Sequence, residues 1–326
     1  MNINWESPVL SSVLKVIDKF SNLSINENEI EKVADWLAYE EFIFPKNNEL
    51  RKNPDDFIRV TMLINTLNFA FTDFVSSTKY EIQNEGHMLS DSEAMFFQIH
   101  KTINSGTNLL DGNVMASIKL EQLKKIFTGN IEMPMLQERV EVLNSVGQTL
   151  VDKYECDWIN FINDGPKKLY SNGEGLIERL VTEFPRFDDS SHYKDINVKL
   201  YKLAQLAFWG IHGELSASNY FKIEDMNSMS AFADYIVPVA LNLMKIVSYE
   251  EELDEKIKKG VLIERDSNEE IEIRAASIYA TAKLTELINA RRPKDKSIII
   301  PQLDYRLWKH YHATHFPHHL TQTIMY

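Results

Sequence analysis

One carboxylate stands among apolar residues in the stretch Ser230-Ala231-Phe232-Ala233-Asp234-Tyr235-Ile236-Val237-Pro238. Proline is tolerated in the first turn of a helix, so this stretch predicts a helix that begins just before Pro238 and continues to Val247. Asp234 is then expected in the loop that leads into the helix, where the positive helix end favours its ionised form. A fixed, partly desolvated carboxylate can stabilise a developing cation. A helix-capping aspartate without chemistry fits the same pattern, and the stretch alone leaves both alternatives open.

Two polar residue types within apolar segments are further candidates for binding. Lys199 and Lys202 are three residues apart in the segment 198–212, whose apolar spacing predicts a helix with both lysines on one face. They could supply a cation for a phosphate, and two surface lysines are the simpler alternative. Asn68 lies in the apolar segment 58–71. A buried amide needs hydrogen-bond partners, which a ligand or two backbone segments could provide.

Two arginines are interpreted from their neighbours along the chain. Arg139 lies close to Glu138 and Glu141 in the segment 133–154, which predicts a solvated charged face. Arg274 lies in the early turns of a helix that is expected to start at the capping-box sequence Ser267-Asn268-Glu269-Glu270. Arginine is unfavourable near the positive helix end, so we expect an anionic group to compensate Arg274.

Histidines are concentrated near residue 326, where five of the nine occur: His310, His312, His315, His318 and His319. His315 and His319 have a spacing that could ligate a metal from one helix. Pro317 lies between them and argues against a continuous helix, and no nearby carboxylate or cysteine completes a ligand set. The sequence therefore predicts no metal site, and we expect histidines that are exposed or hydrogen-bonded.

Composition limits the classes of function. The chain has 326 residues, of which 44% are hydrophobic and 25% charged, as in globular proteins. A net charge of -13 argues against broad binding of nucleic-acid phosphates, but it leaves room for a small basic pocket. Cys156 is the only cysteine, which excludes an intrachain disulfide and suits a reducing compartment. No apolar run is long enough to span a membrane, and residues 1–6 do not resemble a signal peptide, so we expect a cytoplasmic protein.

Nearly every periodic segment has helical spacing, which predicts an all-α fold. We expect a single compact multi-helix body over residues 1–326, with 1–56 as variable N-terminal helices within it. One short β element is allowed near residue 80, and a connector is expected at 45–54, which has a proline at each end. The main expected helices cover residues 58–71, 96–103, 120–127, 133–154, 198–212, 250–259, 267–289 and 302–313.

The stretch around Asp234 resembles the phenylalanine-alanine-aspartate-tyrosine motif of the queuosine salvage proteins, which are queuosine 5'-phosphate N-glycosylases. Further blocks are similar to this family and follow in its order: Leu67-Asn68-Phe69-Ala70-Phe71, Met133-Pro134-Met135-Leu136-Gln137-Glu138-Arg139, Tyr201-Lys202-Leu203-Ala204-Gln205, Glu272-Ile273-Arg274 and Leu303-Asp304-Tyr305-Arg306-Leu307-Trp308. Each block is a weak signal, and together they are a strong one. Two features depart from the family. Residues 92–97 replace its usual glycine-aromatic-tryptophan cluster, and its usual arginines near Leu320 and Gln322 are missing.

The resemblance implies hydrolysis of queuosine 5'-monophosphate to queuine and ribose 5-phosphate, without a metal or cofactor. N-glycosidic cleavage passes through an oxocarbenium-like transition state, so a carboxylate below the ribose is needed, and Asp234 is the catalytic candidate. The base is a 7-deazapurine, which has no N7 to protonate, so the enzyme must hold its other edges. The matched substrate-binding residues are Lys202 for the phosphate, Asp304 and Tyr305 for the base or its cationic side chain, Phe232, Tyr235 and Trp308 as stacking or core rings, and Asn68, Phe71 and Arg274.

The resemblance also implies a body similar to the helix-hairpin-helix DNA glycosylases. We expect a monomer that binds a small molecule and makes no stable contact with nucleic acid or membrane. Two alternatives remain. A non-catalytic helical interaction protein in RNA processing would present an exposed apolar groove, whereas the enzyme would bury Asp234 in a pocket with a lysine or arginine at its rim. An enzyme that excises bases from a polymer is disfavoured by the net charge of -13.

Overall fold

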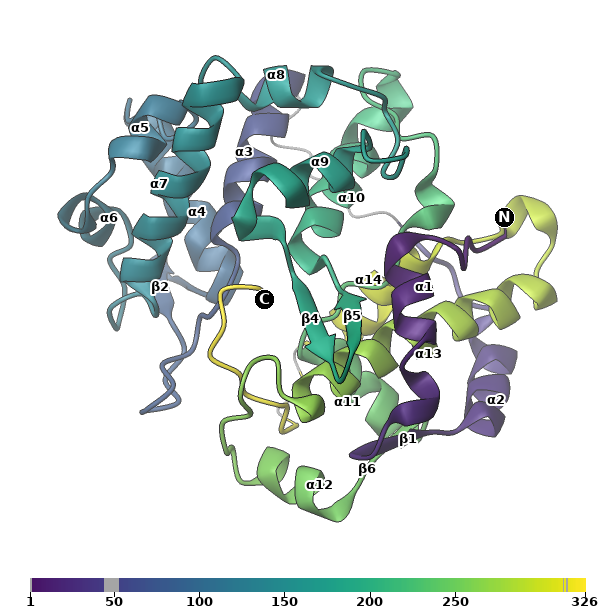
Figure 1. The fold of residues 1–326 in the computed structure, drawn as a ribbon. Helices are drawn as coiled ribbons and strands as arrows, with labels where there is room; N and C mark the ends of the chain where they lie inside the picture. The colour runs from purple at the N-terminus through teal and green to yellow at the C-terminus, as the bar shows by residue number, and fades with distance from the viewer. Residues whose placement is uncertain (1, 44–52, 313, 315) are drawn as a thin grey trace.

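The computed structural model describes residues 2–43, 53–312, 314 and 316–326. The expected connector 45–54 lies almost wholly outside these ranges, as does His315. Within them the chain is mostly helical (Figure 1). The helices are α1 (Pro8–Leu14), α2 (Glu27–Leu37), α3 (Pro54–Leu67), α4 (Asp91–Asn104), α5 (Gly112–Ser117), α6 (Leu120–Ile126), α7 (Leu136–Lys153), α8 (Trp158–Asn163), α9 (Leu176–Glu183), α10 (Lys202–Leu215), α11 (Ile236–Leu243), α12 (Glu251–Lys258), α13 (Asn268–Arg291) and α14 (Ile300–Tyr311).

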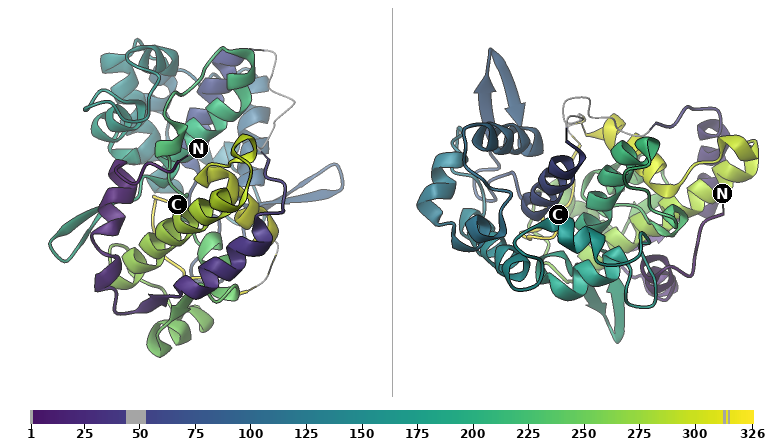
Figure 2. Two further views of the ribbon diagram at one scale, coloured as in Figure 1. Left: turned by 90° about the vertical axis from the view of Figure 1, so that its right-hand side faces the viewer. Right: turned by 90° about the horizontal axis from the view of Figure 1, so that it is seen from above.

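Small antiparallel strand pairs accompany the helices. In the described ranges, β1 (Leu23–Ile25) pairs with β6 (Val247–Tyr249), β2 (Glu81–Asn84) with β3 (His87–Ser90), and β4 (Ser190–Tyr193) with β5 (Ile196–Lys199). The β element expected near residue 80 is thus the β2–β3 hairpin, which extends away from the helices in both views of Figure 2. The all-α expectation is therefore too narrow, and the described chain is mostly helical with additional two-stranded sheets.

Side-chain hydrogen bonds explain where helices α13 and α14 begin. Ser267 precedes α13 and its Oγ accepts the backbone N–H of Glu270 at 3.2 Å, as the capping-box sequence predicts. Pro301 lies in the first turn of α14, and the Gln302 side chain accepts the N–H of Ile299 at 3.1 Å. Both helix starts are therefore specified by local sequence.

Two predicted helix boundaries are wrong because strands intervene. Lys199 ends β5 and Tyr201 has a left-handed φ of 49°, so α10 begins only at Lys202. Lys199 and Lys202 consequently do not share a helix face. The helix that was expected to reach Val247 ends instead at residue 243, because Val247 begins β6. Neither break is marked by glycine or proline in the sequence, which is why helical spacing alone missed them.

Buried apolar side chains form two clusters. One gathers residues of α3, α4, α7, α9 and α10, including Met62 and Phe208. The other gathers residues of α2, α11, α13 and α14, including Ile273 and Leu303. Helix α3 packs on α10, while α11 contacts both α13 and α14. The start of α10 and the loop before α11 share the first cluster, and the N–H of Ser230 donates to the Gln205 side chain at 2.8 Å.

The N-terminal elements pack on the later part of the chain. Helices α1 and α2 contact α13, and β1 pairs with β6 with Ser24 opposite Ser248 (Figure 1). Across the described residues, no helix has the length and apolar character that crossing a membrane requires.

Candidate active site

A pocket of about 1140 Å³ lies between α3, α4, α10, α14 and the loop before α11. Its volume is ample for a nucleotide-sized ligand, since small-molecule sites occupy roughly 300–1,000 Å³. Nine of the ten residues expected at the site line this pocket: Asn68, Phe71, Lys202, Phe232, Asp234, Tyr235, Asp304, Tyr305 and Trp308. Arg274 is not among the lining residues. The fold therefore brings blocks that are far apart in sequence to one cavity.

Asp234 lies in the loop that leads into α11, two residues before the helix begins at Ile236, as its position ahead of Pro238 predicts, and it is only 7% exposed. Its Oδ1 accepts the backbone N–H groups of Ile236 at 2.9 Å and Val237 at 3.0 Å. Oδ2 accepts no hydrogen bond from the described part of the chain. Burial raises the pKa of Asp234, although Lys202 and the two N–H donors act in the opposite direction. The helix end favours the ionised form as expected, but burial outweighs it.

Asp304 from α14 is a second buried carboxylate in the pocket. Its Oδ2 accepts the backbone N–H of Phe232 at 2.9 Å, which fixes the loop that carries Asp234. Burial and the neighbouring Asp234 raise the pKa of Asp304 well above its ordinary value. Two carboxylates in one site repel each other, which raises the pKa of one of them. The pair Asp234 and Asp304 therefore favours one ionised and one neutral carboxyl group.

Lys202 is the first residue of α10 and is buried. Its backbone N–H donates to Asp189 Oδ2 at 3.1 Å, which holds the start of the helix. Its side chain lines the pocket, and none of the described residues forms an ion pair with its ammonium group. Burial lowers the pKa of Lys202, whereas Asp234 raises it. An unpaired buried cation beside a carboxylate is a suitable partner for an anionic ligand group.

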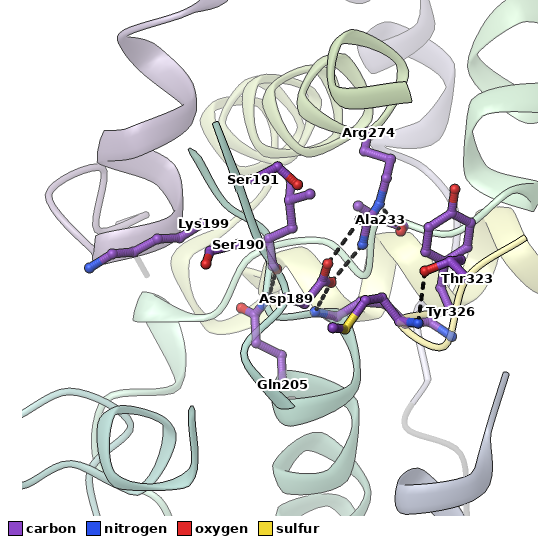
Figure 3. A network of polar contacts seen from close by, with 12 residues as sticks. Asp189, Ser190, Ser191, Lys199, Gln205, Ala233, Arg274, Thr323 and Tyr326 are labelled. Carbon is purple, nitrogen blue, oxygen red and sulfur yellow. Dashed lines mark hydrogen bonds and ion pairs between the residues drawn. The ribbon is translucent and has the colours of Figure 1, made fainter. Parts of the chain in front are cut away.

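Arg274 does not line the pocket, and Figure 3 shows it in a network of polar contacts with Asp189 and Ala233. Its guanidinium forms a two-pronged ion pair with Asp189, with distances of 2.9 and 2.6 Å, and a third contact to Glu270 at 3.1 Å. These are the anions that its position near the start of α13 predicts. Its Nε donates to the carbonyl of Ala233 at 3.0 Å, next to Asp234. Figure 3 also shows Lys199 directed away from this group.

Aromatic rings form one wall of the pocket. Tyr305 and Trp308 of α14 are nearly parallel at 17°, with ring centroids 6.4 Å apart. His312 continues this row, with its ring 4.5 Å from that of Trp308. On the neighbouring wall, the Tyr235 ring lies 4.5 Å from that of His318. Planar faces along a pocket are suited to holding a flat base.

Arg139 corrects the expectation of a solvated charged face, because its side chain is fully buried. Its guanidinium donates to backbone carbonyls at the end of α3, including Ala70 at 2.7 Å and also Leu67 and Phe69. The nearby glutamates suggested a surface position, but carbonyls from a distant segment decide it. Arg139 thereby fixes the loop that presents Asn68 to the pocket.

Comparison with known proteins shows the family to which the chain belongs. The model of the family described as "Queuosine salvage protein" matches residues 48–326, most of the chain. The chain belongs to the queuosine salvage protein family. A protein of Sphaerobacter thermophilus named queuosine 5'-phosphate N-glycosylase/hydrolase is 25% identical over 324 residues, covering 98% of this chain and 97% of that one.

Two further relatives of the queuosine salvage family carry the same name. The protein of Mus musculus is 26% identical, and the match covers 81% of this chain and 80% of its own. The protein of Dictyostelium discoideum is 30% identical, with 72% and 73% covered. The resemblance inferred from the short sequence blocks is therefore confirmed over nearly the full length of the chain.

The segment that departs from the family's usual cluster still reaches the pocket. Ser92, Glu93, Phe96 and Phe97 of α4 are among the lining residues. Phe96 and Phe97 are thus the aromatic side chains that residues 92–97 contribute. Leu320 accepts a hydrogen bond from the N–H of Ile263 at 2.8 Å and does not line the pocket, so this position supplies no charge to it.

Sequence reasoning missed several pocket residues: Asn65, Asp91, Trp209, His312 and Tyr326. Asp91 is the first residue of α4, with a left-handed φ of 54°, and only its place before a helical segment could have indicated it. Tyr326 reaches the pocket because its ring packs against the Arg274 guanidinium at 4.3 Å, a contact with no signature in sequence. Among the described residues, no group of three His, Cys, Asp or Glu side chains could hold a metal ion.

Proposed function

We propose that this protein hydrolyses the N-glycosidic bond of queuosine 5'-monophosphate and releases queuine and ribose 5-phosphate. The observation that carries the proposal is the Asp234 carboxylate. It lies buried in a nucleotide-sized pocket, with Oδ1 held by two N–H donors and with no donor from the described residues on Oδ2. The relatives are named queuosine 5'-phosphate N-glycosylase/hydrolase, and this name supplies the substrate.

The chemistry needs one anion and one proton donor, and the two carboxyl groups meet this need. The bond between C1' and the base nitrogen breaks, and its electron pair goes to the base. Neutral Asp304 donates a proton to the departing base, while ionised Asp234 stabilises the cationic ribose. The oxygen of water then bonds to C1', its proton passes to Asp234, and proton exchange with water restores the starting states. The raised pKa of Asp304 supports its role as the acid.

The other pocket residues bind and position the substrate. The Lys202 ammonium pairs with the 5'-phosphate, for which a lysine is a common point-charge partner. Tyr305, Trp308 and Tyr235 hold the base by their faces, with Asn68, Phe71 and Phe232 completing the walls. Arg274 acts without touching the substrate. It holds the carbonyl of Ala233 next to Asp234, and it pairs with Asp189, which accepts the backbone N–H of Lys202.

The remaining features of the proposal concern the whole molecule. We propose one domain over residues 1–326 that contains the variable segment 1–56, because β1 within that segment pairs with β6 (Val247–Tyr249) in the later part of the chain. We also propose a helix-hairpin-helix glycosylase-like arrangement, a monomer, a cytoplasmic location and no stable binding to nucleic acid. A non-catalytic interaction protein is the alternative. Burial of Asp234 beside Lys202 in a pocket favours the enzyme.

The deciding experiment incubates the protein with queuosine 5'-monophosphate and measures free queuine by mass spectrometry. We expect queuine and ribose 5-phosphate in equal amounts, at a rate proportional to protein concentration. Heat-denatured protein and buffer alone serve as controls. Absence of queuine with folded protein would overturn the proposal and favour the interaction protein.

A further inference from the structure

A third buried carboxylate, at the start of α4, lines the pocket. Asp91 is only 6% exposed. Its Oδ2 pairs with the ammonium group of Lys79 at 3.1 Å, and the Lys79 side chain is 53% exposed. Its Oδ1 is buried and has no hydrogen-bond partner among the described residues. A buried carboxylate oxygen without a hydrogen-bond donor destabilises the fold. A donor from a bound ligand would remove this unfavourable free energy at Oδ1.

Asp91 faces the same part of the pocket as Asp234. Burial is the main cause that raises the pKa of the Tyr235 phenol, and both carboxylates raise it further. Burial lowers the pKa of the neighbouring His318 ring, and both carboxylates act against that shift. The Tyr235 side chain therefore lies within electrostatic reach of both acids. One ligand in the pocket could therefore meet Asp234 and Asp91 with different groups.

The backbone at Asp91 has an unusual conformation. Its φ of 54° lies in the left-handed region, which Asp and Asn adopt more readily than most other residues. Its N–H donates to the carbonyl of Tyr80 at 3.0 Å, which anchors the turn from β3 into α4. This anchored turn places the carboxyl group at the pocket wall and makes asparagine the natural test substitution.

We propose that Asp91 binds the protonated secondary amine that joins the 7-deazaguanine of the substrate to its cyclopentenediol. This inference rests on the proposed function, because the substrate comes from it. The substrate then carries one permanent cation, at this amine, and develops another at the ribose during cleavage. Asp234 stabilises the cation that develops at the ribose, and Asp91 binds the cation at the amine. Asp304 suits the amine less well, because its Oδ2 already accepts the N–H of Phe232 and its raised pKa favours a neutral group.

The test compares three bases that differ only in the side arm. Queuine and 7-aminomethyl-7-deazaguanine carry the amine, whereas 7-deazaguanine lacks it. Dissociation constants are measured by calorimetry for the wild type and for Asp91→Asn. Asp266→Asn is the matched control, because Asp266 also has a left-handed φ, of 63°, and does not line the pocket.

A charge-assisted hydrogen bond predicts that Asp91→Asn binds queuine and 7-aminomethyl-7-deazaguanine roughly 10- to 100-fold more weakly. Its affinity for 7-deazaguanine should stay within about twofold of the wild type, and Asp266→Asn should bind all three like the wild type. Equal weakening for the three bases, or none for any, would overturn the assignment of Asp91. Turnover of queuosine 5'-monophosphate is measured in parallel. Wild-type protein that prefers the amine-bearing bases but releases no queuine would overturn the proposed reaction and leave the amine site standing.

Discussion

Replacing Asp234 by asparagine tests the central charge of the site while changing little else. The asparagine Oδ1 can still accept the N–H groups of Ile236 and Val237, so the start of α11 keeps its cap. Alanine would lose both contacts, at about 1 kcal/mol for a missing cap, which makes it a poorer test. Asp234→Asn therefore isolates the negative charge.

The expected loss of rate follows from Coulomb's law. A carboxylate about 4 Å from a developing unit cation contributes roughly 4 kcal/mol at an effective dielectric constant near 20. Each 1.36 kcal/mol corresponds to about tenfold in rate, so kcat should fall roughly a thousandfold. Stability should change little. Removing a charge that burial disfavours is stabilising, but Lys202 loses a nearby anion, and these effects oppose each other.

The assay is single-turnover release of queuine from queuosine 5'-monophosphate, followed by mass spectrometry, with thermal unfolding measured on the same samples. A net change below about 1 kcal/mol would keep Tm within about 4 °C of the wild type. Asp266→Asn is the control for a general effect of the substitution. A folded Asp234→Asn protein that releases queuine within tenfold of the wild-type rate would refute the catalytic role of Asp234.

Three further outcomes are expected. Lys202→Ala should lower kcat/KM for the 5'-phosphate substrate roughly ten- to a thousandfold and spare the plain nucleoside, and equal losses on both substrates would exclude phosphate binding. A chelator should leave activity unchanged, and loss that zinc restores would contradict the absence of a metal requirement. The pH profile of kcat should be bell-shaped: activity falls at low pH as Asp234 is protonated, and at high pH as Asp304 loses its proton through a raised pKa. Asp304→Asn should remove the high-pH decline, and a variant that keeps it would assign that titration to another group.

The sequence predicted the pocket better than it predicted the backbone around it. Asp234 and Pro238 specify a loop and a helix start by local rules, and the structure has both. The boundary between Lys199 and Lys202 could not be predicted in this way. It depends on β4–β5 pairing and on the left-handed Tyr201, and no glycine or proline marks that position.

Arg139 and Asp91 show why some features in and around the pocket could not be predicted from the sequence. Their environments are set by residues that lie far away in sequence or in a neighbouring hairpin. Arg139 is buried by carbonyls at the end of α3, some 70 positions earlier, so its glutamate neighbours were misleading. Asp91 enters the pocket because the β2–β3 hairpin directs the chain into α4 through a left-handed residue. The spacing of residues within one helix shows neither contacts with distant segments nor the path of the chain out of a hairpin.

Arg274 explains how Asp234 and Lys202 are held in fixed positions in the pocket. Its guanidinium holds the carbonyl of Ala233, and its partner Asp189 holds the N–H of Lys202. One buried ion pair thereby sets the separation between the loop before α11 and the first turn of α10. Loss of the arginine would leave Asp189 as an uncompensated buried charge, which typically costs about 3–5 kcal/mol. The ion pair is therefore a positioning element of the fold, which fixes the backbone of the loop before α11 and of the first turn of α10.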